Sequence, residues 1–172
     1  TALIINCSKS AGRLELVKEE IIKKGALCET FVGDVSNYST VNEMFDLAIS
    51  IYGKVNVLIN NAGIASIGLF QDMTPDMWNN IMSVNLNSVY NCCHFAVQDM
   101  LRRHCGKIIN ISSVWGLYGA SCEVAYSATK GAINSFTKAL AKELAPSNIQ
   151  VNAIACGAID TEMNGHLSPE EL

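Results

Sequence analysis

Residues 107–130 read KIINISSVWGLYGASCEVAYSATK, and this stretch decides the fold. Its apolar start predicts a β-strand that ends at Ser112 and Ser113. Thirteen residues after Ser113, Tyr126 opens a predicted helix, and Lys130 follows four positions later. A strand followed by a long helix is the repeating unit of an α/β protein.

The spacing of Tyr126 and Lys130 indicates acid–base chemistry. Residues at i and i+4 share one helix face, so the ammonium can approach the phenol. An isolated phenol titrates near ~10, and a neighbouring cation lowers its pKa. Ser113 at the end of the strand can hold a substrate oxygen by hydrogen bonding. We predict proton transfer to an oxygen while a hydride moves at carbon, although a Tyr-x-x-x-Lys pair alone is common on ordinary helices.

Composition excludes several other classes of function. The chain has 172 residues, 49% hydrophobic content and a net charge of -4, which favours one domain over residues 1–172 and gives no electrostatic case for nucleic acid. No apolar run approaches the ~20 residues that span a bilayer, and the start lacks a signal-peptide pattern. We therefore expect a cytoplasmic protein with no membrane partner.

The seven cysteines do not predict a disulfide framework or a metal centre. They are scattered without a C-x-x-C pair. Cys92, Cys93 and His94 are adjacent in sequence, but neighbours on a helix point in different directions. We expect no metal.

Strand and helix patterns alternate through the rest of the chain. Further strands are predicted over residues 2–5, 27–32, 55–59 and 150–155, with helices from Ser10 to Lys24, Thr40 to Tyr52, Pro75 to Arg103, and Tyr126 to about Ala145. Five parallel-type strands separated by helices predict an α/β fold with a doubly wound, Rossmann-like parallel sheet.

Two polar features accompany these elements. Asn60-Asn61-Ala62-Gly63 follows a predicted buried strand, where small residues let a flat ligand approach the backbone, or where they simply form a turn. Asn85 lies inside the long predicted helix, where an amide is a poor helix former and needs a partner. It is either a satisfied core amide or a residue that holds a water near the site.

Five motifs in order resemble the short-chain dehydrogenase/reductase family, most of all its bacterial 3-oxoacyl-[acyl carrier protein] reductase branch. They are Asn60-Asn-Ala-Gly63, Asn85 in Val-Asn-Leu, Ser113 in Ile-Ser-Ser-Val, Tyr126-Ser-Ala-Thr-Lys130, and Val151-Asn-Ala-Ile-Ala-Cys-Gly157 with Thr161. The resemblance covers essentially the whole chain.

The resemblance implies a role for each matched catalytic residue. Tyr126 would be the general acid for carbonyl reduction, and Ser113 would orient the substrate oxygen. Lys130 would lower the pKa of Tyr126 and hold the nicotinamide ribose beside it. Asn85 would hold a water that links Lys130 to solvent.

The resemblance also implies a nicotinamide cofactor and where it lies. Asp34 and Val35 would border the adenine, the segment of Asn61, Ala62 and Gly63 the adenosine ribose, and Ile159 and Thr161 the carboxamide. Lys9 follows the first predicted strand where an acidic residue would select NAD. A cation there favours the 2′-phosphate of NADP, so we expect NADP, with NAD less favoured.

The chain departs from the family pattern at both ends. It lacks the glycine-rich turn Thr-Gly-x-x-x-Gly-x-Gly, whose amides cradle the cofactor's pyrophosphate. Residues 2–5 match the family's second strand, so we expect the first strand, the glycine-rich turn and the last strand to be absent from these residues. Two inner sheet edges would then lack partners. We expect a partial record of a longer protein; 172 residues alone would bind dinucleotide negligibly.

Three functions remain open. The first is NADPH-dependent reduction of a 3-oxoacyl thioester on acyl carrier protein. The second is oxidation or reduction of another alcohol or ketone, such as a sugar, a steroid or a small secondary alcohol. The third is a non-catalytic scaffold or oligomerisation fragment. The resemblance also implies a homotetramer or homodimer.

Overall fold

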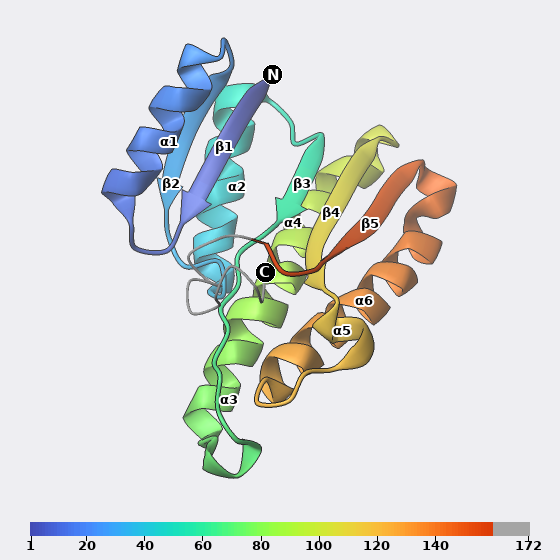
Figure 1. Cartoon of the computed structure of the whole chain (residues 1–172). Helices are drawn as coiled ribbons and strands as arrows, with labels where there is room; N and C mark the ends of the chain where they lie inside the picture. The colour runs from blue at the N-terminus through green and yellow to red at the C-terminus, as the bar shows by residue number, and fades with distance from the viewer. Residues whose placement is uncertain (160–172) are drawn as a thin grey trace.

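The computed structural model describes residues 1–159, in which strands and helices alternate (Figure 1). Every strand pairing in this range is parallel, which confirms the predicted α/β class. The strands are β1 (Ala2–Cys7), β2 (Leu27–Val32), β3 (Val57–Asn60), β4 (Gly106–Ser113) and β5 (Ile149–Cys156). The α-helices are α1 (Ala11–Lys23), α2 (Tyr38–Tyr52), α3 (Pro75–Met82), α4 (Ser88–Arg103), α5 (Trp115–Tyr118) and α6 (Val124–Leu144).

The strands form two sheets. β1 pairs with β2, while β4 lies between β3 and β5 in a second sheet. Figure 1 shows β1 and β3 running side by side across a gap, and no backbone pairing joins these two strands. The predicted pair of inner edges without a partner is therefore present in residues 1–159.

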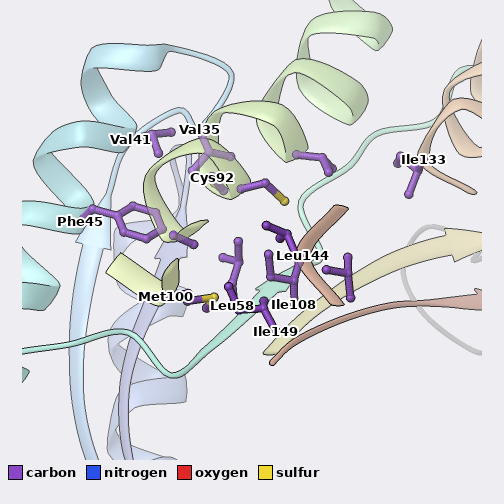
Figure 2. Packing of buried hydrophobic residues seen from close by; sticks show 14 residues of the cluster. Val35, Val41, Phe45, Leu58, Cys92, Met100, Ile108, Ile133, Leu144 and Ile149 are labelled. Atoms are coloured by element: carbon purple, nitrogen blue, oxygen red, sulfur yellow. The ribbon is translucent and has the colours of Figure 1, made fainter. Parts of the chain in front are cut away.

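The main hydrophobic core lies between the three-stranded sheet and the helices behind it. α4 packs against β3 and β4, α6 packs against β4 and β5, and α2 packs against α4. Val41, Met100 and Ile108 are completely buried there. Figure 2 shows these side chains converging from α2, α4 and β4. The core fixes α6 against the end of β4, which is where the predicted catalytic residues lie.

Two predicted boundaries shift in the structure, and capping explains one of them. α2 begins at Tyr38, not Thr40, because the Asn37 side chain accepts hydrogen bonds from the amides of Ser39 and Thr40. Ser10 occupies the N-cap position of α1, but its side chain makes no cap hydrogen bond. The third strand begins at residue 57 and not 55.

The long helix predicted from Pro75 to Arg103 is interrupted. Residues 83–87 form a π-helical turn between α3 and α4, and Asn85 lies at its centre. A π-turn accommodates one extra residue, which rotates the helix beyond it. The prediction of an uninterrupted α-helix was therefore wrong at Asn85.

The sequence did not predict α5, the short helix directly after β4. Its Gly116 lies so close to α6 that a Cβ atom there would be 2.5 Å from the carbonyl carbon of Lys130. Among residues 1–159, no helix is long and apolar enough to cross a membrane.

Candidate active site

The predicted catalytic residues meet at the carboxyl end of the three-stranded sheet. Ser113 is the last residue of β4 and lies opposite Cys156 at the end of β5. Tyr126 and Lys130 lie in the first two turns of α6, which packs against both strands. The exposed fractions of Ser113 and Lys130 are 6% and 4%, while Tyr126 is half-buried. In an open parallel sheet, this edge is where ligands bind.

The Tyr126 phenol interacts with Ser113 in a protein environment that disfavours ionisation. Burial raises the pKa of Tyr126, and a side-chain hydrogen bond with Ser113 acts in the opposite direction. The Ser113 hydroxyl oxygen also accepts a hydrogen bond from the amide of Trp115 at 3.2 Å. That bond leaves the hydroxyl proton of Ser113 available to the phenol or to a substrate oxygen.

Lys130 lies beside Tyr126, with its ammonium over the face of the phenol ring. The ammonium donates a hydrogen bond to the carbonyl of Ile111 at 2.7 Å and lies 5.5 Å from the centroid of the Tyr126 ring. Burial lowers the pKa of Lys130 itself, and the charge of Cys156 opposes that shift. Burial of the phenol dominates the net shift, so the pKa of Tyr126 is raised. The lowering of that pKa by Lys130 stays a prediction.

Asn85 joins the loop after β3 to α6. Its Oδ1 accepts a hydrogen bond from the Ile64 amide at 2.8 Å, and its Nδ2 donates to the Ile64 carbonyl at 2.9 Å and to Thr129 Oγ1 at 3.2 Å. Asn85 is therefore a satisfied buried amide, one of the two predicted alternatives. Its role in holding a water stays a prediction.

Three further residues hold the backbone of α6, and sequence reasoning missed them. Ser112 Oγ donates to the Lys130 carbonyl at 3.2 Å, and Thr129 Oγ1 donates to the Tyr126 carbonyl at 2.7 Å. Gly116 permits the close approach of α5 to Lys130. A hydroxyl inside a helix gives only a weak sequence signal, because such side chains frequently bond to their own helix.

The segment predicted to border the adenosine ribose leads directly to Lys130. Asn61 and Ala62 are exposed after β3. A Cβ atom on Gly63 would lie 3.4 Å from Asn85 Oδ1 and 3.7 Å from Lys130 Nζ. Both distances are ordinary van der Waals contacts, so this loop lies directly against Asn85 and the Lys130 ammonium.

The other predicted cofactor residues have different surroundings. Lys9 is exposed after β1, and the exposed Asp34 accepts the Ser36 amide in a turn after β2. The Val35 side chain is buried within the hydrophobic core, and its carbonyl accepts a hydrogen bond from Asn91. Its place beside adenine stays a prediction. Ile159 is exposed, and Thr161 lies outside the described residues.

Comparison with known proteins identifies the family of this chain. The family model for short chain dehydrogenases matches residues 1–172. The chain is 38% identical over 146 residues to the 3-oxoacyl-[acyl-carrier-protein] reductase FabG of Chlamydia muridarum, covering 85% of this chain and 59% of that protein. It is 38% identical over 166 residues to FabG of Staphylococcus aureus, covering 96% of this chain and 68% of that protein.

Solved structures of related enzymes have the same fold. A gluconate 5-dehydrogenase from Burkholderia cenocepacia in complex with NADP and tartrate aligns with a TM-score of 0.90 and 32% identity, over 97% of this chain and 65% of that one. An NAD⁺-bound xylitol dehydrogenase aligns with a TM-score of 0.88 and 30% identity, over 91% and 60%.

The chain thus spans 59% of the length of the Chlamydia relative. The family model matches all of residues 1–172, and the fold agrees with both solved structures. The chain belongs to the short chain dehydrogenase family.

Proposed function

We propose that this chain is the catalytic part of an NADPH-dependent reductase that converts a 3-oxoacyl thioester on acyl carrier protein to the 3-hydroxyacyl form. The observation that carries the proposal is the meeting of Ser113, Tyr126 and Lys130 at the carboxyl edge of β4 and β5. The 38% identity to two reductases named for this reaction supports the choice of substrate.

The mechanism assigns each step to a side chain. Ser113 donates a hydrogen bond to the ketone oxygen and orients it toward Tyr126. As a hydride adds to the carbonyl carbon, the C=O π electrons move to oxygen, and Tyr126 Oη delivers its proton there. The product is a neutral hydroxyl, and the enzyme holds a phenolate beside the Lys130 ammonium. A phenol is protonated at neutral pH even at its ordinary pKa of about 10, so Tyr126 carries the proton that a general acid donates. Its raised pKa lies farther from neutral pH than acid catalysis favours.

A nicotinamide cofactor, when bound, supplies the hydride. Lys130 and the segment of Asn61 to Gly63 would hold its riboses, and Ile159 and Thr161 would meet its carboxamide. The exposed cation of Lys9 at the carboxyl end of β1 favours NADP over NAD. Relatives leave both choices open, since the gluconate 5-dehydrogenase binds NADP and the xylitol dehydrogenase binds NAD⁺.

The proposal is tested by NADPH oxidation with an acetoacetyl thioester. We expect Tyr126→Phe to lower kcat by about 10²–10⁴-fold, because general acid catalysis contributes on that scale. Tyr118→Phe is the control, since Tyr118 is 83% exposed on α5 and its phenol belongs to no step of the mechanism. Equal and measurable rates for wild-type protein and Tyr126→Phe would refute the mechanism.

A second candidate is a polyol or sugar-acid oxidoreductase. The gluconate 5-dehydrogenase and xylitol dehydrogenase share 32% and 30% identity with this chain at TM-scores of 0.90 and 0.88. The same assay run in reverse, with gluconate or xylitol and either NADP⁺ or NAD⁺, separates the candidates. Turnover of a polyol without turnover of the thioester would replace the first proposal with the second.

We also propose that the chain forms one dinucleotide-binding unit, works in the cytoplasm and assembles as a homotetramer or homodimer. The family match over residues 1–172 supports this proposal. Analytical ultracentrifugation would test the assembly, and a monomer at all concentrations would contradict it.

A further inference from the structure

Thr129 lies at the junction of two parts of the candidate site. It is completely buried in α6, one residue before Lys130. Its hydroxyl donates to the Tyr126 carbonyl at 2.7 Å and accepts from Asn85 Nδ2 at 3.2 Å. Asn85 in turn makes two hydrogen bonds to the backbone of Ile64, the residue after Gly63. A continuous series of hydrogen bonds thus runs from the loop after β3 to the backbone of Tyr126.

The direction of every hydrogen bond in this series is fixed. The Ile64 amide must donate, so Asn85 presents its oxygen there and its nitrogen to the Ile64 carbonyl and to Thr129. The single hydroxyl proton of Thr129 goes to the Tyr126 carbonyl, which leaves its oxygen to accept from Asn85. Each buried polar group has a partner in one arrangement, and such networks hold a local geometry tightly.

We propose that Thr129 is a positioning residue that couples the loop at Gly63 and Ile64 to Tyr126. It touches neither substrate nor reacting atoms, and it acts through the backbone that carries the phenol. This inference rests on the proposed function for its effect on turnover. It goes beyond that function because it makes the distance between the cofactor-side loop and the proton donor depend on one hydroxyl.

The local alternative is that Thr129 merely bonds to its own helix. Threonine hydroxyls often donate to the carbonyl three or four residues earlier, and Tyr126 is three residues before Thr129. That role alone would not need the second bond from Asn85, which lies 44 residues away in the π-turn. The two roles predict different results when the hydroxyl is removed.

The test replaces Thr129 by valine, which keeps the shape and removes the hydroxyl. We expect kcat to fall by about tenfold to a hundredfold with a smaller change in KM, because small displacements of reacting groups cost on this scale. Without substrate, amide exchange at Ile64 should accelerate and the titration midpoint of Tyr126, followed by ¹³Cζ NMR, should rise as its contact with Ser113 weakens. Thr129→Ser should restore all three readouts.

Thr137→Val is the matched control. Thr137 is also buried in α6 and accepts a hydrogen bond from a buried asparagine, Asn110, at 2.9 Å. We expect this variant to lose similar stability while kcat and the Tyr126 midpoint stay within about twofold and about 0.2 pH units, because distant sites act independently. Equal effects in Thr137→Val and Thr129→Val would overturn the proposal.

Two further outcomes are decisive. Thr129→Ala is made alongside, so that a folding defect specific to valine does not end the test; unchanged Ile64 exchange and Tyr126 titration in the folded variant would refute the coupling. Retained turnover in Tyr126→Phe would instead refute the proposed function. The exchange and titration readouts need no substrate and would still decide the role of Thr129.

Discussion

Burial and hydrogen bonding act in opposite directions on the Tyr126 phenol. Burial raises the pKa, whereas the hydrogen bond from Ser113 stabilises the phenolate and lowers it. Ser113→Ala removes the second effect, so the midpoint of Tyr126 should rise further above its ordinary value of about 10. ¹³Cζ NMR of tyrosine-labelled protein measures it, with Tyr126→Phe identifying the signal. A lower midpoint in Ser113→Ala would contradict this account.

The same shift has a consequence for stability. A raised pKa means that the folded protein holds the phenolic proton more tightly than the unfolded chain does. The stabilising contribution is fully present below the unfolded value of about 10 and is lost as pH rises through the folded value. Lys130 acts oppositely: its lowered pKa makes its buried charge a cost that lessens as pH rises toward the unfolded value.

The identities of the reactive residues could be predicted from sequence, but their protonation could not. The spacing of Ser113, Tyr126 and Lys130 indicates a strand end facing a helix face, and the structure places all three at one edge. The direction of the pKa of Tyr126 depends on how much protein covers the phenol, which spacing does not encode. Thr129 gave no signal because its partner Asn85 lies on another element.

At the scale of elements, α5 fixes the position of α6 through contact at Gly116. A Cβ atom there would lie 2.5 Å from the Lys130 carbonyl carbon and 2.8 Å from the Gly131 amide nitrogen, and backbone cannot yield as a flexible side chain can. We expect Gly116→Ala to lower the free energy of unfolding by about 1–3 kcal/mol, the range for overpacking. Urea unfolding followed by circular dichroism measures it.

Gly12→Ala is the control for that substitution. Gly12 lies within α1, and a Cβ atom there would meet nothing within 4 Å. Alanine should stabilise this helix by about 0.5–1 kcal/mol, because it loses less backbone entropy than glycine. If Gly116→Ala were as stable as wild type, α5 would not be held against α6 in solution.

The element pattern shows where sequence periodicity fails. The apolar spacing from Pro75 to Arg103 correctly predicts helical structure on both sides of Asn85. It does not predict the π-turn, because one extra residue changes the phase of the pattern only slightly over a short window. The conflict was visible only as an amide in a helix interior that needed a partner. That partner proved to be the Ile64 backbone, 21 residues earlier.

At the scale of the whole molecule, the two sheets differ in how they are supported. The main hydrophobic cluster begins at Val35 and is built from α2, α4, α6 and the three-stranded sheet. Leu14 and Cys28 are buried in the first unit, β1–α1–β2, but do not belong to that cluster. The alternation of elements predicted the parallel pairing, whereas the gap between β1 and β3 was predicted only from the family's strand order.

This division predicts two steps of opening. Without backbone pairing across the gap, β1, α1 and β2 contact one another more extensively than they contact the main core, while β4 is hydrogen-bonded on both sides. Regions with fewer buried apolar contacts open at lower free energy. In the 172-residue protein, amides of β1 and β2 should exchange faster than those of β4, with a weaker dependence on added denaturant. Native-state hydrogen exchange across a urea series measures both quantities. Identical opening free energies and denaturant slopes for β1, β2 and β4 would show that the unit and the main core unfold together, and that the facing edges are joined in solution.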